Sequence, residues 1–327
     1  MIRSIFFTPD AQLKTDLSQI DIAFALHEPK GVLWVDFEAS TPDEDEPLLR
    51  KTFSFHPLAI DDALQEAHSP KLDNWGNYLY IVLHSVLYDY KEGDIDSLEL
   101  DIFIGDHYIV THHDKPIEAV SKVWEVVHRD PNTIRLGADH LLYLLSDEVV
   151  SSYMPAVEEL DRSLDIIEDE IFSNPNPSTL ARIFTVKRSV LFLRRMISPQ
   201  REVMNKLARD DYQVIDEQDR VYFRDVYDHL FRLYDITEGV RDLVSGTMDT
   251  YLSVMNNRLN DVMKTLTIIT TVFMPISFIA SFFGMNFFQP AVPLGIWTGF
   301  PAFIITLLII LMTPLGMFLW MRRRGWM

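Results

Sequence analysis

The chain has 327 residues, which is enough for one sizeable soluble domain and a membrane module. It carries a formal net charge of −19 and no cysteine, so disulfides and thiolate metal sites are excluded. An acidic protein of this kind repels nucleic acid and attracts cations, although the same charge can also be an ordinary solvated surface.

The N-terminal part alternates strand and helix patterns. Its first apolar run ends at Pro9 and is too short for a secretory signal, so we expect this part to stay in the cytoplasm. Strands are expected at residues 31–37, 78–83 and 101–111, the last of these folding back at Gly105-Asp106, and helices at 42–54 and 57–67. These patterns predict a cytoplasmic α/β domain over residues 1–115.

After Pro116 the pattern is helical. Apolar residues at three- and four-residue spacing predict helices over 139–172 and 178–209, the second with a kink at Pro199. No proline lies between Gln200 and Met274, so we expect one helix from about residue 216 through 283, roughly 100 Å long. Residues 116–263 would then form a helical stalk, followed by a transmembrane domain over 264–327.

Two long uncharged stretches lie near the C-terminus, and we expect spans at about 265–284 and 297–321. Each can cross a hydrocarbon core of roughly 30 Å, whereas buried core helices would rarely combine this length with charged flanks. Lys264 precedes the first span and Arg322-Arg323-Arg324 follows the second, while no acidic residue follows Asp261. By the positive-inside rule, the protein is expected to be a multi-pass inner (plasma) membrane protein with both termini in the cytoplasm.

An acidic ladder runs along the predicted stalk. Aspartate recurs every seven residues, at Asp228, Asp235, Asp242 and Asp249, and the same spacing continues into the first span as Asn256, Met263, Thr270 and Ser277. A neighbouring stripe is apolar and consists of Leu233, Ile236, Val240, Leu243 and Val244. A bundle of helices can bury the apolar stripe while the polar one lines an axis or faces water. Lining a central axis would require several copies of the chain.

A short motif lies at the end of the first span. Gly284-Met285-Asn286 is preceded by Phe282-Phe283, and upstream lie the segments 257–267 and Phe273-Met274-Pro275. This ordered set resembles the CorA magnesium-transporter family, whose signature is Gly-Met-Asn. The likeness is closest over residues 222–287. It implies an α+β fold assembled as a funnel-shaped pentamer, a channel in which the long helix of each subunit lines the axis.

The resemblance also implies residue roles. Gly284, Met285 and Asn286 would form the selectivity filter, where Asn carbonyls accept hydrogen bonds from the water shell of Mg²⁺. Spacing alone would also let Asn286 simply cap the helix C-terminus. The pore-facing residues implied by the alignment are Asn260, Met263, Leu266, Met274, Ser277 and Ser281, and the seven-residue stripe adds Thr270. At the positions of Ser277 and Ser281 the family usually has Thr and Gly.

Regulation by metal is implied as well. In CorA-like channels, divalent ions bound between cytoplasmic domains of adjacent subunits hold the pore closed, through acidic residues that align with Asp89 and Asp225. Mg²⁺ would thus be both regulator and cargo, with Co²⁺ and Ni²⁺ also permeating. Both aspartates could instead be plain surface charges. The loop 288–295 is uncharged, unlike the acidic loop of many magnesium importers, so a zinc transporter of the same family stays an alternative, and a membrane-tethered metal sensor is another.

Other chemistry finds little support in the sequence. His112 and His113 are adjacent on a predicted strand and should point to opposite faces, which disfavours a shared metal site. No Gly-rich phosphate loop, nucleophile elbow or HExxH motif occurs, so an enzyme or an energy-coupled pump is not expected. Passive flow suffices, since a divalent ion gains roughly 4.6 kcal/mol per 100 mV of membrane potential.

Overall fold

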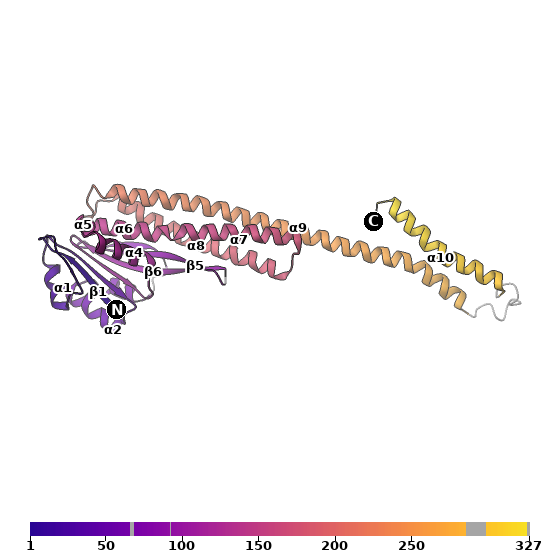
Figure 1. Cartoon of the computed structure of the whole chain (residues 1–327), viewed down its shortest axis with the longest axis horizontal. Coiled ribbons are helices and arrows are strands. Elements are labelled where there is room, and N and C mark those ends of the chain that lie inside the picture. The colour runs from indigo at the N-terminus through magenta and orange to yellow at the C-terminus, as the bar shows by residue number, and fades with distance from the viewer. Residues whose placement is uncertain (66–68, 92, 286–298, 326–327) are drawn as a thin grey trace. The chain divides into compact units, whose positions relative to one another are not determined.

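The computed structural model describes residues 1–65, 69–91, 93–285 and 299–325. It divides into two compact units, Met1–Asp249 and Thr250–Met327, which we call unit 1 and unit 2. The last strand ends at His113, and all later elements of the described chain are helical (Figure 1).

Unit 1 is built on a seven-stranded sheet with the strand order β2-β1-β3-β7-β6-β5-β4. The strands are β1 (Ile2–Phe7), β2 (Leu13–Thr15), β3 (Val32–Glu38), β4 (Lys71–Asn74), β5 (Leu79–Asp89), β6 (Asp94–Gly105) and β7 (Tyr108–His113). Only β3 and β7 pair in parallel; the other neighbours are antiparallel. The β5–β6 hairpin is the longest, with paired residues from Leu79↔Ile104 to Asp89↔Asp94.

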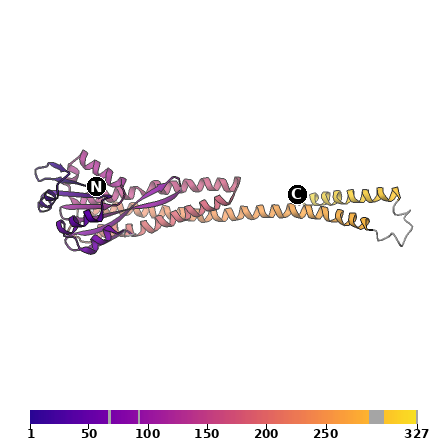
Figure 2. The same cartoon turned by 90° about the horizontal axis from the view of Figure 1, so that it is seen from below.

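Helices cover both faces of this sheet (Figure 2). One face carries α1 (Gln19–Leu26), α2 (Pro42–Pro47), the π-helical turn η1 (Leu48–Thr52) and α3 (Pro57–Leu64). Of these elements, α1, η1 and α3 share a core with alternate residues of β3. The other face carries α4 (Glu118–Arg129), α5 (Asn132–Arg135), α6 (Ala138–Ser151), α7 (Tyr153–Ser173) and α8 (Pro177–Arg209). Trp34 marks the second face, because its ring meets Trp124 of α4 edge-on at 4.7 Å.

Two long helices complete the chain, α9 (Arg220–Gly284) and α10 (Phe300–Arg323). Both are long enough, and contain windows apolar enough, to cross a membrane. The expected architecture of an α/β domain, a long helix and two C-terminal apolar helices is confirmed.

The expected strands and most helices are present, with local differences. The helix predicted over 139–172 is two helices, α6 and α7, which meet at Ser152. That hydroxyl accepts a hydrogen bond from the Val86 backbone N–H and donates one to the Val149 carbonyl, so the break is also a contact with the sheet. The N-terminal run rejected as a signal is strand β1, and α8 continues through Pro199.

Candidate functional site

The part of α9 in unit 1 presents two different faces. One face is buried by the chain itself and consists of Phe223, Val226, Leu230, Leu233, Val240 and Val244. The four aspartates of the ladder, Asp228, Asp235, Asp242 and Asp249, are all exposed on the opposite side. Ile236 and Leu243 of the predicted apolar stripe are 42% and 52% exposed in the single chain. The ladder is therefore open to solvent within one chain, beside apolar side chains that the chain leaves uncovered.

Asp89 and Asp225 lie on different elements of unit 1. Asp89 is the last residue of β5, and its Oδ1 accepts a hydrogen bond of 2.8 Å from the Lys91 backbone N–H. Asp225 is exposed on α9, where its charge contributes to raising the pKa of Asp147 on α6, behind burial as the main cause. Both carboxylates are exposed in the single chain, as residues of a subunit interface would be.

Three other carboxylates converge between α6 and the segment before α9. Asp139, Asp216 and Asp219 each offer an oxygen within 4.8 Å of the other two. The Asp139 oxygens accept hydrogen bonds from the backbone N–H groups of His140 and Asp216, both at 3.0 Å, while burial raises the Asp139 pKa. Oxygen ligands of this kind suit a hard cation. Sequence reasoning missed the group, because its members are far apart in the chain and lack a spacing motif.

His112 and His113 point to opposite faces of the sheet, as expected. The Nε2 atom of His112 lies 3.5 Å from Asp45, and its Nδ1 atom lies 3.7 Å from Asp101. Burial opposes the charged imidazole, but hydrogen bonds and charge from Asp101 and Asp45 outweigh it and raise the His112 pKa to about 9. On the other face, His113 Nε2 lies 3.3 Å from Asp36. Each histidine thus lies beside buried carboxylates of the fold, on opposite faces of the sheet.

In unit 2, the predicted pore-facing residues follow one side of α9. They are Asn260, Met263, Leu266, Thr270, Met274, Ser277 and Ser281, and all are exposed in the single chain. At 100° per residue their side chains fall within about 120° of the helix circumference. The hydroxyl of Thr270 donates a hydrogen bond of 2.9 Å to the Leu266 carbonyl, which reduces the cost of an apolar surrounding.

The predicted filter begins where α9 ends. Gly284 is the last residue of the helix, and Met285 follows it with an exposed side chain. Asn286 lies outside the described residues, so its predicted role stays a prediction. In α10, Met321 is buried, and most of the other large apolar side chains are exposed, including Phe300, Ile305 and Trp320. Both helices of unit 2 therefore present apolar surfaces that lipid or further protein would cover.

Comparison with known proteins gives consistent results over nearly the whole chain. A model of the family described as CorA-like Mg²⁺ transporter protein matches residues 29–323. YfjQ of Bacillus subtilis is 34% identical over 294 residues, which cover 90% of this chain and 89% of that protein. The cobalt/magnesium transport protein CorA of Thermotoga maritima is 38% identical over 236 residues, covering 72% of this chain and 67% of that protein.

The fold agrees with a solved structure. The complete structure of the CorA magnesium transporter from Methanocaldococcus jannaschii superposes with a TM-score of 0.84 and covers 99% of this chain and 98% of that one. The sequence identity is 21%, so this likeness shows the fold alone.

Proposed function

Because the chain belongs to the CorA-like Mg²⁺ transporter family, we propose that it conducts hydrated divalent cations, most readily Mg²⁺ and also Co²⁺ or Ni²⁺, through the inner membrane. The T. maritima relative is named for cobalt and magnesium, and neither curated relative reported above is named for zinc. We propose that the chain is divided as its sequence predicts, into a cytoplasmic domain (1–115), a helical stalk (116–263) and a transmembrane domain (264–327). Both termini would lie in the cytoplasm.

The observation that carries this proposal is the stripe on α9 from Asn260 to Ser281. Hydroxyl and amide groups recur on one side of α9 over this stretch, and from Val272 to Phe283 every residue outside the stripe is apolar. A lipid-facing side would gain nothing from them, whereas a water-filled axis would. The apolar Met263, Leu266 and Met274 on the same stripe would narrow such an axis, and apolar constrictions can close a pore by dewetting.

An axis of this kind requires an oligomer, and the family resemblance implies five copies. One helix cannot surround a pore, and the exposed Ile236 and Leu243 in unit 1 would be covered by neighbouring copies. The membrane lipid would cover the remaining apolar surface of α9 and α10. The acidic ladder would then raise the local cation concentration along the cytoplasmic path.

The filter would select by hydration chemistry. Mg²⁺ gives up its water reluctantly, so a ring of Asn286 amides around a hydrated ion would accept hydrogen bonds from its water ligands. Closure would follow when cytoplasmic Mg²⁺ bridges Asp89 and Asp225 of adjacent subunits, because carboxylates across an interface repel until a cation lies between them.

Ion flux into liposomes tests the proposal. The full chain is reconstituted, and uptake of Mg²⁺, Co²⁺, Ni²⁺ and Zn²⁺ is followed with fluorescent indicators under an imposed membrane potential. We expect Mg²⁺, Co²⁺ and Ni²⁺ to enter. Uptake of Zn²⁺ alone would favour a zinc transporter, and no flux of any ion would leave a membrane-tethered sensor. Native mass spectrometry of the same preparation tests the five-copy assembly.

A further inference from the structure

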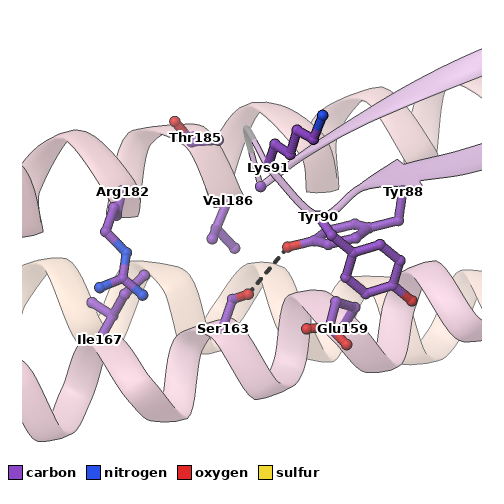
Figure 3. A pocket seen from close by; sticks show the side chains of 10 residues that line it. Tyr88, Tyr90, Lys91, Glu159, Ser163, Ile167, Arg182, Thr185 and Val186 are labelled. Carbon is purple, nitrogen blue, oxygen red and sulfur yellow. Dashed lines mark hydrogen bonds between the residues drawn. The ribbon is translucent and has the colours of Figure 1, made fainter.

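A pocket of about 320 Å³ lies within unit 1, between the turn of the β5–β6 hairpin and the helices α7 and α8 (Figure 3). Its lining includes Tyr88 and Tyr90 from the hairpin, Ser163 and Ile167 from α7, and Arg182 and Val186 from α8. None of these residues has a part in the proposed ion path. The volume lies within the range of small-molecule sites.

One end of the pocket is formed by Arg182. Its Nη1 donates a hydrogen bond of 2.7 Å to Glu170 Oε2, while Glu170 Oε1 accepts hydrogen bonds from Asn176 Nδ2 at 3.0 Å and Thr179 Oγ1 at 2.9 Å. Glu170 is thereby fixed by the turn between α7 and α8, and it holds the guanidinium in place. A guanidinium has five N–H donors in a planar fork, so donors remain for an oxyanion.

Two hydroxyls lie across the pocket from Arg182. The oxygens of Tyr88 and Ser163 are 3.3 Å apart, and either can be the donor (Figure 3). Whichever hydroxyl donates to the other, the accepting one keeps its own hydrogen for a ligand oxygen. The buried Ile167 and Val186 supply apolar surface, and the exposed Tyr90 ring, edge-on to Tyr88 at 5.0 Å, supplies an aromatic face.

The charges of the lining favour an anion. The carboxylate of Glu159 is already paired with Arg162, and Arg182 is held by Glu170. Lys91, at the rim, forms no ion pair with any residue that the structure describes. A surplus positive charge here contrasts with the net charge of −19 for the whole chain.

We propose that this pocket binds a small phosphate ester of nucleotide size. The phosphate oxygens accept hydrogen bonds from Arg182 and from the Tyr88–Ser163 hydroxyl pair, as in charge-assisted recognition of phosphate. The rest of the ligand packs against the side chains of Val186 and Ile167 and contacts the Tyr90 ring. The ligand contacts neither the transported ion nor the Asp89 and Asp225 carboxylates, and Asp89 instead accepts a hydrogen bond from the Lys91 backbone N–H.

Calorimetric titration of the full chain in lipid nanodiscs, without divalent cations, tests this assignment with AMP and inorganic phosphate as probes. We expect AMP to bind, and Arg182→Gln to weaken it by about tenfold or more because a charge-assisted hydrogen bond is lost. Ser163→Ala should weaken it by about threefold while leaving the Arg182–Glu170 pair intact. Arg195→Gln is the matched control, since Arg195 is exposed on the same helix outside the pocket, and should bind AMP like the parent.

Several results would overturn the assignment. If no heat of binding is measured at millimolar AMP, the pocket does not bind AMP and the proposal is wrong. If the parent, Arg182→Gln and Ser163→Ala bind AMP equally well, AMP binds somewhere other than this pocket. Inorganic phosphate should bind more weakly than AMP, because it lacks the nucleoside that would contact Val186, Ile167 and the Tyr90 ring. Equal affinity for the two probes would refute the nucleotide-sized ligand. Because the assay contains no Mg²⁺ and measures no flux, failure here leaves the transport proposal unaffected.

Discussion

The two units use the same helix in different ways. In unit 1, Leu230 and Leu233 of α9 are fully buried by the chain's own side chains. In unit 2, Leu266 and Phe278 of that helix are 56% and 70% exposed, and α10 shows the same pattern. Exposed apolar surface of this extent is unfavourable in water. Unit 1 is therefore stabilised by its own core, whereas the exposed apolar surface of unit 2 has to be covered by something outside the single chain. Single substitutions can test this difference.

The largest expected effect is on transport alone. Asn286→Ala should abolish divalent cation uptake, because the amide carbonyl that would hold the ion's water is lost while the helix is kept. The measurement is Mg²⁺ flux into liposomes, with thermal unfolding of unit 1 recorded beside it. Gln289→Ala removes another side-chain amide three residues further along the chain and should conduct like the parent. Parent-like flux in Asn286→Ala would remove this residue from the filter.

A matched pair of phenylalanines on α9 tests the contrast in burial. Phe223→Ala empties a fully buried position and should cost about 3–5 kcal/mol of unfolding free energy. Phe278→Ala changes an exposed position in unit 2 and should alter the stability of unit 1 by less than about 0.5 kcal/mol. Chemical unfolding followed by circular dichroism, with the full chain in detergent, compares the two. Equal losses would mean that the units do not derive their stability separately.

The burial contrast also explains which features the sequence could predict. The strands β3 and β5 and the two C-terminal helices carry long apolar signals that depend little on tertiary context. The edge strands β2 and β4 have three and four residues and no clear alternation of apolar and polar residues, so the sequence did not predict them. The break at Ser152 depends on a hydrogen bond from the distant Val86, which no local spacing reveals.

The candidate site follows the same rule. The α9 stripe could be predicted because Met263, Thr270 and Ser277 repeat every seven residues along one helix, and the family resemblance supplied its other members. The trio of Asp139, Asp216 and Asp219 could not, because a chain reversal brings Asp139 to the other two. Nor could the pocket beside Arg182, which depends on how the β5–β6 hairpin packs against α7 and α8.

A smaller effect is expected from the buried histidine of unit 1. The pKa of His112 is raised from 6.5 to about 9, so its protonated form stabilises the fold. That contribution is fully present below pH 6.5 and is lost as the pH rises through 9, for a change of up to about 3 kcal/mol. Unfolding free energies between pH 6 and about 9.5 should fall in the parent. His112→Gln should flatten this decline, and an unchanged slope in that variant would assign the pH dependence to other groups.

The smallest expected effect is on regulation. It concerns how a metal bound in unit 1 would control the pore in unit 2. If Asp89 and Asp225 of adjacent subunits share a bridging cation, removing both charges should weaken that metal and shift the closed-to-open equilibrium while leaving the filter unchanged. Substitution by Asn preserves size and much of the hydrogen bonding, so a change reports on charge. The double variant Asp89→Asn with Asp225→Asn should need at least about fivefold more Mg²⁺ to close, and should lose Mg²⁺-dependent protection from proteolysis over the same range of Mg²⁺ concentration.

The control variant, Asp43→Asn with Asp62→Asn, removes two other carboxylates of unit 1 and should close like the parent. Closure of the Asp89/Asp225 variant at the parent's Mg²⁺ concentration would make both residues surface charges, and the sensor would then be sought on the ladder, first at Asp228 and Asp249.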